Sequence, residues 1–196
     1  MSKFFTSDWH IGEQATPNTD SFLRPRPTEV MAEEWLVQCE AIIKPDDDLY
    51  LLGDLAITLD DWEFYKRLPK CKIHIICGDK ETGGKNYDFQ ALDRKIREEF
   101  DNVVYFTAEC GFVEIGGMSW RMEHKPEELL RYALYMPSLC GHVHGIWRTQ
   151  CMPNGEPIIN VSIDAWGGLV TEEHIMHQYN AIKKGYYDRN ARVDQW

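Results

Sequence analysis

The chain has 196 residues, of which 43% are hydrophobic and 27% are charged, and its formal net charge is −11 at pH 7. This composition is typical of a globular protein and excludes a disordered or membrane-spanning chain, and the length fits one domain over residues 1–196. The negative charge disfavours a broad, sequence-independent grip on nucleic acid, which gains its affinity by neutralising phosphates.

The first half of the chain alternates predicted strands and helices. Apolar runs predict strands over 3–6, 49–52 and 72–77. Helical spacing predicts a helix from Thr28 until Pro45, a short helix ending at Arg67, and an amphipathic helix over 89–100. Alternation of this kind is typical of an α/β layered domain with right-handed crossovers.

The second half has shorter predicted elements. Strands are predicted over 103–106, 112–115 and 118–122, and the glycines between them indicate antiparallel pairing. Pro126 begins a helix, a pair of strands surrounds the turn at 154–155, and Thr171 begins a C-terminal helix. No secretory signal is recognised, and the six cysteines lack the spacing of a zinc ribbon or disulfide framework. We therefore expect a cytoplasmic protein with no membrane partner.

Carboxylates and histidines follow several of these strands. The residues at such positions are Asp8, His10, Asp54, Asp79, His124, His142 and His144. Because strand ends at one edge of a layered domain converge, we expect these side chains to meet. Seven oxygen and nitrogen ligands are too many for one tetrahedral zinc, but they suit two divalent ions that share a bridging carboxylate. Taken singly, each motif is also an ordinary strand-ending turn.

The order of these motifs resembles that of the calcineurin-like metallophosphoesterases. The blocks of that family are Asp-x-His, Gly-Asp, Gly-Asn-His-Asp/Glu, a lone His and Gly-His-x-His. The corresponding segments here are Asp8-Trp9-His10, Gly53-Asp54, Gly78-Asp79-Lys80-Glu81, His124 and Gly141-His142-Val143-His144. Segments 24–27, 44–47 and 160–164 also look like those of the short single-domain members found in phages and bacteria. A phage-encoded copy would act in the host cytoplasm.

The resemblance implies a four-layer α/β/β/α sandwich of two mixed β-sheets flanked by helices. It implies two divalent metal ions, with Asp54 bridging them, and a bridging hydroxide that attacks phosphorus in line. We expect manganese, and iron, zinc, cobalt and nickel also suit a mixed histidine and carboxylate shell. The first ion would take Asp8, His10 and His144, and the second would take Asp79, His124 and His142.

The third block departs from the family pattern at two positions. Asp79 stands where the family has Asn, and Lys80 stands where it has His. Asp79 can still ligate a metal ion. A lysine is ordinarily a poor proton donor at neutral pH, so we expect Lys80 to act as a point charge on the phosphate. Asp in place of Asn adds one negative charge and Lys in place of a neutral His adds one positive charge, so the net charge of the block is unchanged. We therefore expect the effects of these two differences on activity to depend on each other.

The predicted function is a phosphoric ester hydrolase with Lys80 and Asp54 as catalytic residues. Lys80, Arg24 and Arg26 are predicted to contact the substrate, although a solvated surface position explains each arginine equally well. The substrate would be a phosphate mono- or diester of a nucleotide, another small molecule or a phosphoprotein. Two alternatives are a phosphate or nucleotide binder without turnover and a nuclease acting on single strands or ends. The sequence does not predict the oligomeric state.

Overall fold

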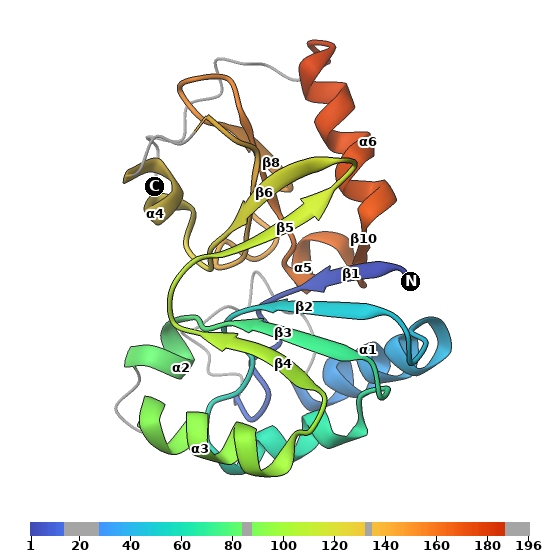
Figure 1. The fold of residues 1–196 in the computed structure, drawn as a ribbon, viewed down its shortest axis with the longest axis vertical. Coiled ribbons are helices and arrows are strands. Elements are labelled where there is room, and N and C mark those ends of the chain that lie inside the picture. Colours follow the sequence, from blue (N-terminus) through green and yellow to red (C-terminus); the bar gives the residue numbers. More distant parts are fainter. Residues whose placement is uncertain (14–27, 84–87, 132–134, 187–196) are drawn as a thin grey trace.

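The computed structural model describes residues 1–13, 28–83, 88–131 and 135–186 (Figure 1). The first part of the chain contains β1 (Lys3–Thr6), α1 (Thr28–Ile42), β2 (Asp48–Leu52), η1 (Asp60–Arg67), β3 (Lys72–Ile76), α2 (Asp79–Gly83), α3 (Phe89–Glu99) and β4 (Val103–Thr107). The second part contains β5 (Gly111–Ile115), β6 (Met118–Met122), α4 (Pro126–Arg131), β7 (Ser138–Cys140), β8 (Thr149–Cys151), β9 (Pro157–Asn160), α5 (Ile163–Trp166), β10 (Val170–Thr171) and α6 (Glu172–Lys183).

The first sheet has the strand order β10-β1-β2-β3-β4, with β1 to β4 parallel and β10 antiparallel to β1. Its central strand β2 is buried along its whole length. Because side chains alternate across a strand, Leu49 and Leu51 join the core that contains α1, η1 and α3. Tyr50 and Leu52 join the core of the opposite face, which contains side chains of the second sheet.

The second sheet has the order β5-β6-β7-β9-β8 and is also mixed, with β6, β7 and β9 parallel. Phe5, Leu52 and Ile76 of the first sheet share one core with Trp120 and Leu139 of the second. The sheets therefore pack face to face, with α1 and α3 on the outer side of the first sheet (Figure 1). Helix α6 contributes Ile175 to the core between the sheets.

These observations confirm a mixed α/β fold with two mixed sheets and flanking helices; the four-layer order stays a prediction. The antiparallel pairing predicted after residue 103 is correct for β5 and β6 but wrong for β4, which pairs parallel with β3. A crossover containing α3 separates these two strands, and such a connection returns the chain in the same direction. Within the described ranges, no helix has the length and apolar character that crossing a membrane requires.

Candidate metal centre

The loops that follow β1, β2, β6 and β7 meet through hydrogen bonds that main-chain N–H groups donate. The Asp8 N–H donates to the Gly53 carbonyl at 3.0 Å, and the Gly141 N–H donates to the His124 carbonyl at 2.9 Å. The His142 N–H donates to both carboxylate oxygens of Asp8, at 3.0 and 3.1 Å. The ends of strands from both sheets are therefore joined at one place, as the sequence predicted.

The glycines that precede the ligand candidates permit this close approach. A Cβ atom at Gly78 would lie 2.5 Å from Asp54 Oδ1, and one at Gly53 would lie 2.6 Å from His124 Nδ1. Contacts that short do not occur between a real Cβ atom and its neighbours. Each position therefore needs a residue without a side chain, because the neighbouring loop fills the space.

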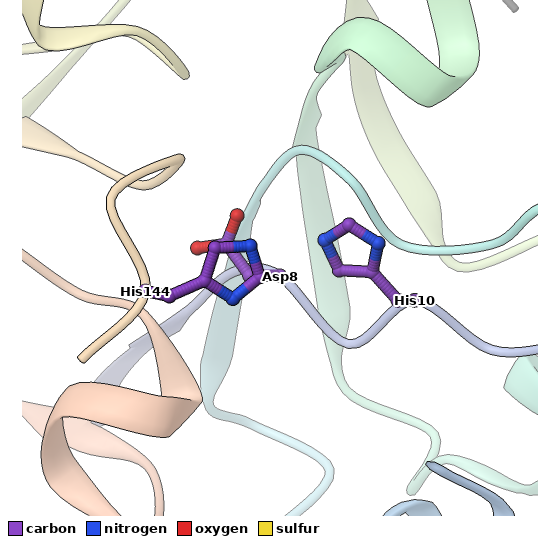
Figure 2. A group of neighbouring side chains, drawn as sticks. All are labelled: Asp8, His10 and His144. Atoms are coloured by element: carbon purple, nitrogen blue, oxygen red, sulfur yellow. The ribbon is translucent and has the colours of Figure 1, made fainter. Parts of the chain in front are cut away.

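Within the part of the chain that the structure describes, two groups of three side chains could each hold a metal ion, since the ligand atoms of each group lie within 4.8 Å of one another. The first group is Asp8, His10 and His144. Figure 2 shows Asp8 and His10 on the segment that follows β1, and His144 approaching them from the loop that follows β7. The second group is Asp54, His124 and His142.

Asp54, a member of the second group, also faces the first group. Its Oδ2 atom is 3.6 Å from His10 Nε2 in the first group and 3.5 Å from His124 Nε2 in the second. Its other oxygen, Oδ1, accepts a hydrogen bond from the Lys80 main-chain N–H at 2.9 Å. This carboxylate therefore faces one histidine of each group, and its role as a bridging ligand stays a prediction.

The backbone of the centre is left-handed at an unusual set of positions. Among the described residues, every non-glycine residue with positive φ is a predicted ligand; they are Asp8 (61°), His10 (49°), Asp54 (51°), His142 (71°) and His144 (47°). A left-handed conformation is strained in residues with a Cβ atom and persists only where the surroundings enforce it. Strain of this kind concentrates at functional sites.

Two of the histidines are hydrogen-bonded through Nδ1, and a third has a carboxylate oxygen close to that atom. His144 Nδ1 is hydrogen-bonded to Asp164 Oδ2 at 2.6 Å, and His124 Nδ1 to the Leu52 carbonyl at 2.8 Å. Glu13 Oε2 lies 2.7 Å from His10 Nδ1. Metal-binding histidines usually have such a partner, because it fixes the tautomer and the ring orientation.

The Nε2 atoms of His10 and His124 are buried and, among the described residues, have no hydrogen-bond partner. A buried polar atom without a partner costs free energy in a folded protein. Both atoms face the Asp54 carboxylate at distances too long for a hydrogen bond. These atoms therefore fit a cation that would lie between imidazole and carboxylate.

Asp54 and His124 stabilise each other's charged form within the buried centre. Burial by itself would raise the pKa of Asp54, but the imidazoles of His124 and His10 outweigh it and hold that pKa well below its usual range. Burial by itself would lower the pKa of His124, but the Asp54 carboxylate raises it to about 9. Burial lowers the pKa of His142, and the nearby His124 lowers it further.

Glu81 joins the loops that carry Asp54 and Asp79. Its side chain is completely buried and accepts N–H groups from Asp54 at 3.0 Å, Leu55 at 2.8 Å and Gly78 at 2.8 Å. Burial raises the pKa of this carboxyl group, and the neighbouring Asp54 raises it further. Glu81 thus has a structural role, because its carboxylate holds together the loops that carry Asp54 and Asp79.

The two altered positions of the third block pair with different residues. Asp79 has a half-exposed side chain, with Oδ1 2.5 Å from Lys125 Nζ and Oδ2 3.8 Å from His142 Nδ1. Lys80 Nζ lies 3.5 Å from Glu13 Oε1. Asp79 and Lys80 thus have different ion-pair partners, so any coupling between their substitutions would act through other residues. Arg24 and Arg26 lie outside the described residues.

Four contributors to this region were not assigned a role from the sequence: Glu13, Glu81, Asp164 and Lys125. Asp164 is hydrogen-bonded to His144, and Glu13 has a carboxylate oxygen close to His10. Asp164 is separated from His144 by 20 residues, so no spacing rule connects them. In the sequence, Asp164 lies at the start of a helix that comes soon after a strand. That position could have indicated that Asp164 lies at the sheet edge where the other strand ends meet.

No protein-family model and no curated protein matches the sequence. Among solved structures, the protein of unknown function AQ665 from Aquifex aeolicus has a TM-score of 0.64 and 18% identity, and the match covers 90% of this chain and 98% of that one. This likeness shows a shared fold. An archaeal phosphodiesterase and a phosphopantetheinyl hydrolase from Mycobacterium tuberculosis each have a TM-score of 0.49, at 14% and 15% identity. Both matches cover 82% of this chain, and they cover 82% and 88% of those chains.

We expect Glu81→Ala to lower the free energy of unfolding by about 3 kcal/mol or more, because buried N–H groups lose their acceptor. Glu81→Gln should cost less, because the amide keeps one acceptor oxygen. Chemical denaturation measures both changes. Glu98→Ala, at an exposed position on α3, is the control and should change stability by less than about 0.5 kcal/mol. Equal stability of Glu81→Ala and Glu98→Ala would contradict the structural role of Glu81.

The pKa values of Asp54 and His124 predict a pH window for chelator-treated protein. The raised pKa of His124 contributes stability that is complete below the unfolded value of roughly 6.5 and is lost as pH rises through about 9. The lowered pKa of Asp54 contributes stability above roughly pH 4 that is lost as pH falls through its folded value.

Melting temperatures measured from pH 6 to 10 test this window. The difference between wild type and His124→Gln should shrink above about pH 9, where His124 loses its charge in the folded state. A difference that stays constant over the whole range would show that the Asp54–His124 interaction does not depend on the imidazole charge.

Proposed function

We propose that this chain is a metal-dependent phosphoesterase of the calcineurin-like metallophosphoesterase type, with one domain over residues 1–196 arranged as a four-layer α/β/β/α sandwich. The observation that carries the proposal is the left-handed backbone of Asp8, His10, Asp54, His142 and His144. Each strained residue costs on the order of 1 kcal/mol or more. Strain at five ligand candidates in one place indicates that the loops are shaped for ligation rather than for stability.

Two divalent ions would be held by the side chains that the two groups present. Asp8, His10 and His144 would bind the first ion, and His124 and His142 the second. Asp54 would bridge the ions, because the same carboxylate oxygen faces one histidine of each group. Asp79 would complete the second set from its position beside His142. We propose manganese first, and iron, zinc, cobalt or nickel would suit the same donors.

Two bound divalent ions would supply an acidified water as nucleophile near pH 7 and would neutralise the phosphoryl oxygens. The side chains fix the geometry for this chemistry. Glu13 and Asp164 hold the rings of His10 and His144 in orientation, and Glu81 holds the loop of Asp54. Lys80 offers a positive charge to the substrate phosphate. The substrate would be an ester of a nucleotide, another small molecule or a phosphoprotein, because a net charge of −11 disfavours extended nucleic acid.

A phosphate binder without turnover is the second candidate. It is favoured by the position of Lys80, whose amino group lies 3.5 Å from Glu13 and which is ordinarily a poor acid for a leaving alkoxide. Metal and phosphate would still bind in such a protein. The rate on an activated ester distinguishes the two candidates.

We expect purified protein to contain two divalent ions per chain after incubation with manganese. Asp54→Ala should lose both ions, because the bridging carboxylate contributes to both groups, and His144→Ala should lose one. Elemental analysis of desalted protein measures this. His177→Ala, at an exposed position on α6, is the matched control and should retain both ions. One ion in the wild type, or two in Asp54→Ala, would contradict the proposed centre.

We expect aryl phosphates to be hydrolysed at least about 100-fold faster than alkyl monoesters, because a good leaving group needs no proton from the protein and general acid catalysis is typically worth that much. Steady-state rates on an aryl monoester, an aryl diester and an alkyl monoester with manganese measure the difference. Equal rates on aryl and alkyl esters would show that the protein does protonate the leaving group.

A further inference from the structure

Lys125 lies beside the second ligand group but has no part in the proposed ligand set. It follows His124 directly, just before α4, and its Nζ atom is 2.5 Å from Asp79 Oδ1. Its side chain is one-third exposed, at 33%. Together with Asp79 and His124 it lines an open cavity of about 170 Å³. The amino group can therefore be reached from solvent while it stays close to the centre.

The Asp79 carboxylate faces two competing partners. Its Oδ1 atom is paired with the lysine, and its Oδ2 atom is 3.8 Å from His142 Nδ1. A cation that took Asp79 together with His142 would draw this carboxylate toward the ligand group. The Lys125 ammonium would then lose part of its ion pair, and its charge would become available to another anion.

We propose that Lys125 is a phosphate-binding residue that Asp79 holds until an ion binds at the second ligand group. The proposal rests on the proposed function, since it needs that group to bind a divalent ion. Lysine binds phosphate as a point charge and needs no fixed orientation, so release from one carboxylate is sufficient. Lys80, held by Glu13 near His10, would approach the same phosphate from the first group.

The charges of the centre support this role. Three carboxylates, those of Asp8, Asp54 and Asp79, would face two dications. That set leaves a single net positive charge for a phosphate dianion. The carboxylates of Glu123 and Glu128 also line the cavity beside the second group, so a phosphate there needs a further positive charge, and Lys125 is the lysine that lines the same cavity.

Manganese titrations of metal-free protein test the competition step by calorimetry. In Lys125→Met, one of the two manganese sites should bind about 3- to 10-fold more tightly, because the ion at the second ligand group no longer competes for Asp79. In the Asp79→Asn background, the same substitution should change that affinity by less than about 2-fold, because the shared carboxylate is gone. An equal gain in both backgrounds would show that Lys125 acts only through its charge and would overturn the competition.

Binding of inorganic phosphate to manganese-loaded protein tests the second step. Lys125→Met should weaken phosphate binding about 10-fold, the size expected for one lost charged hydrogen bond, and Lys125→Arg should keep it within about 3-fold. Lys183→Met is the matched control, because Lys183 forms a similar ion pair with Glu156 at 2.7 Å and is 36% exposed on α6. It should change neither metal nor phosphate affinity.

Failure of this proposal is distinguishable from failure of the proposed function. Wild-type protein that binds two manganese ions but has the same phosphate affinity as Lys125→Met would overturn the role of Lys125 alone. Wild-type protein that binds no manganese would overturn the proposed metal centre, and the role of Lys125 with it. The same loss of phosphate affinity in Lys183→Met would also count against a specific role.

Discussion

The arrangement of the candidate metal centre depends on the interaction of the buried Asp54 carboxylate with two imidazole rings. Its Oδ2 atom faces His10 at 3.6 Å and His124 at 3.5 Å, and its Oδ1 atom accepts the Lys80 N–H. A carboxylate is costly to bury unless donors or cations surround it. The rings that face it come from loops after β1 and β6, so this one group ties together strands of both sheets.

The packing between the two sheets sets the distance between the ligand candidates that each sheet presents. The first sheet presents Asp8, His10 and Asp54, while the second presents the three remaining histidines of the two groups. Phe5 and Leu52 lie in the shared core directly before the first set of loops. Because a packed core is nearly incompressible, it holds the two halves at a fixed separation. The Glu81 carboxylate then fixes the loop of Asp54, and the rigid frame sustains the left-handed backbone of the ligand candidates.

The sequence predicted the parts of this arrangement that depend on local pattern. Apolar runs predicted β1, β2 and β3, and the polar residues that follow several strands predicted that the strand ends would meet, because strand ends of a layered domain share an edge. The direction of β4 was mispredicted, since glycine spacing says nothing about the crossover before it. The partners of His144 and Asp79 were also missed. Asp164 lies 20 residues from His144 in the sequence, and Lys125 lies 46 residues from Asp79. Side-chain contacts over such separations leave no periodic pattern in the sequence.

Anomalous diffraction from manganese-soaked crystals is the most direct measurement of the proposed centre, because it locates each ion. We predict two peaks per chain. One peak should lie among Asp8, His10 and His144, and the other should lie beside His124 and His142. The Asp54 carboxylate should contact both ions. A single peak, or two peaks that do not share Asp54, would contradict a dinuclear centre built on that carboxylate.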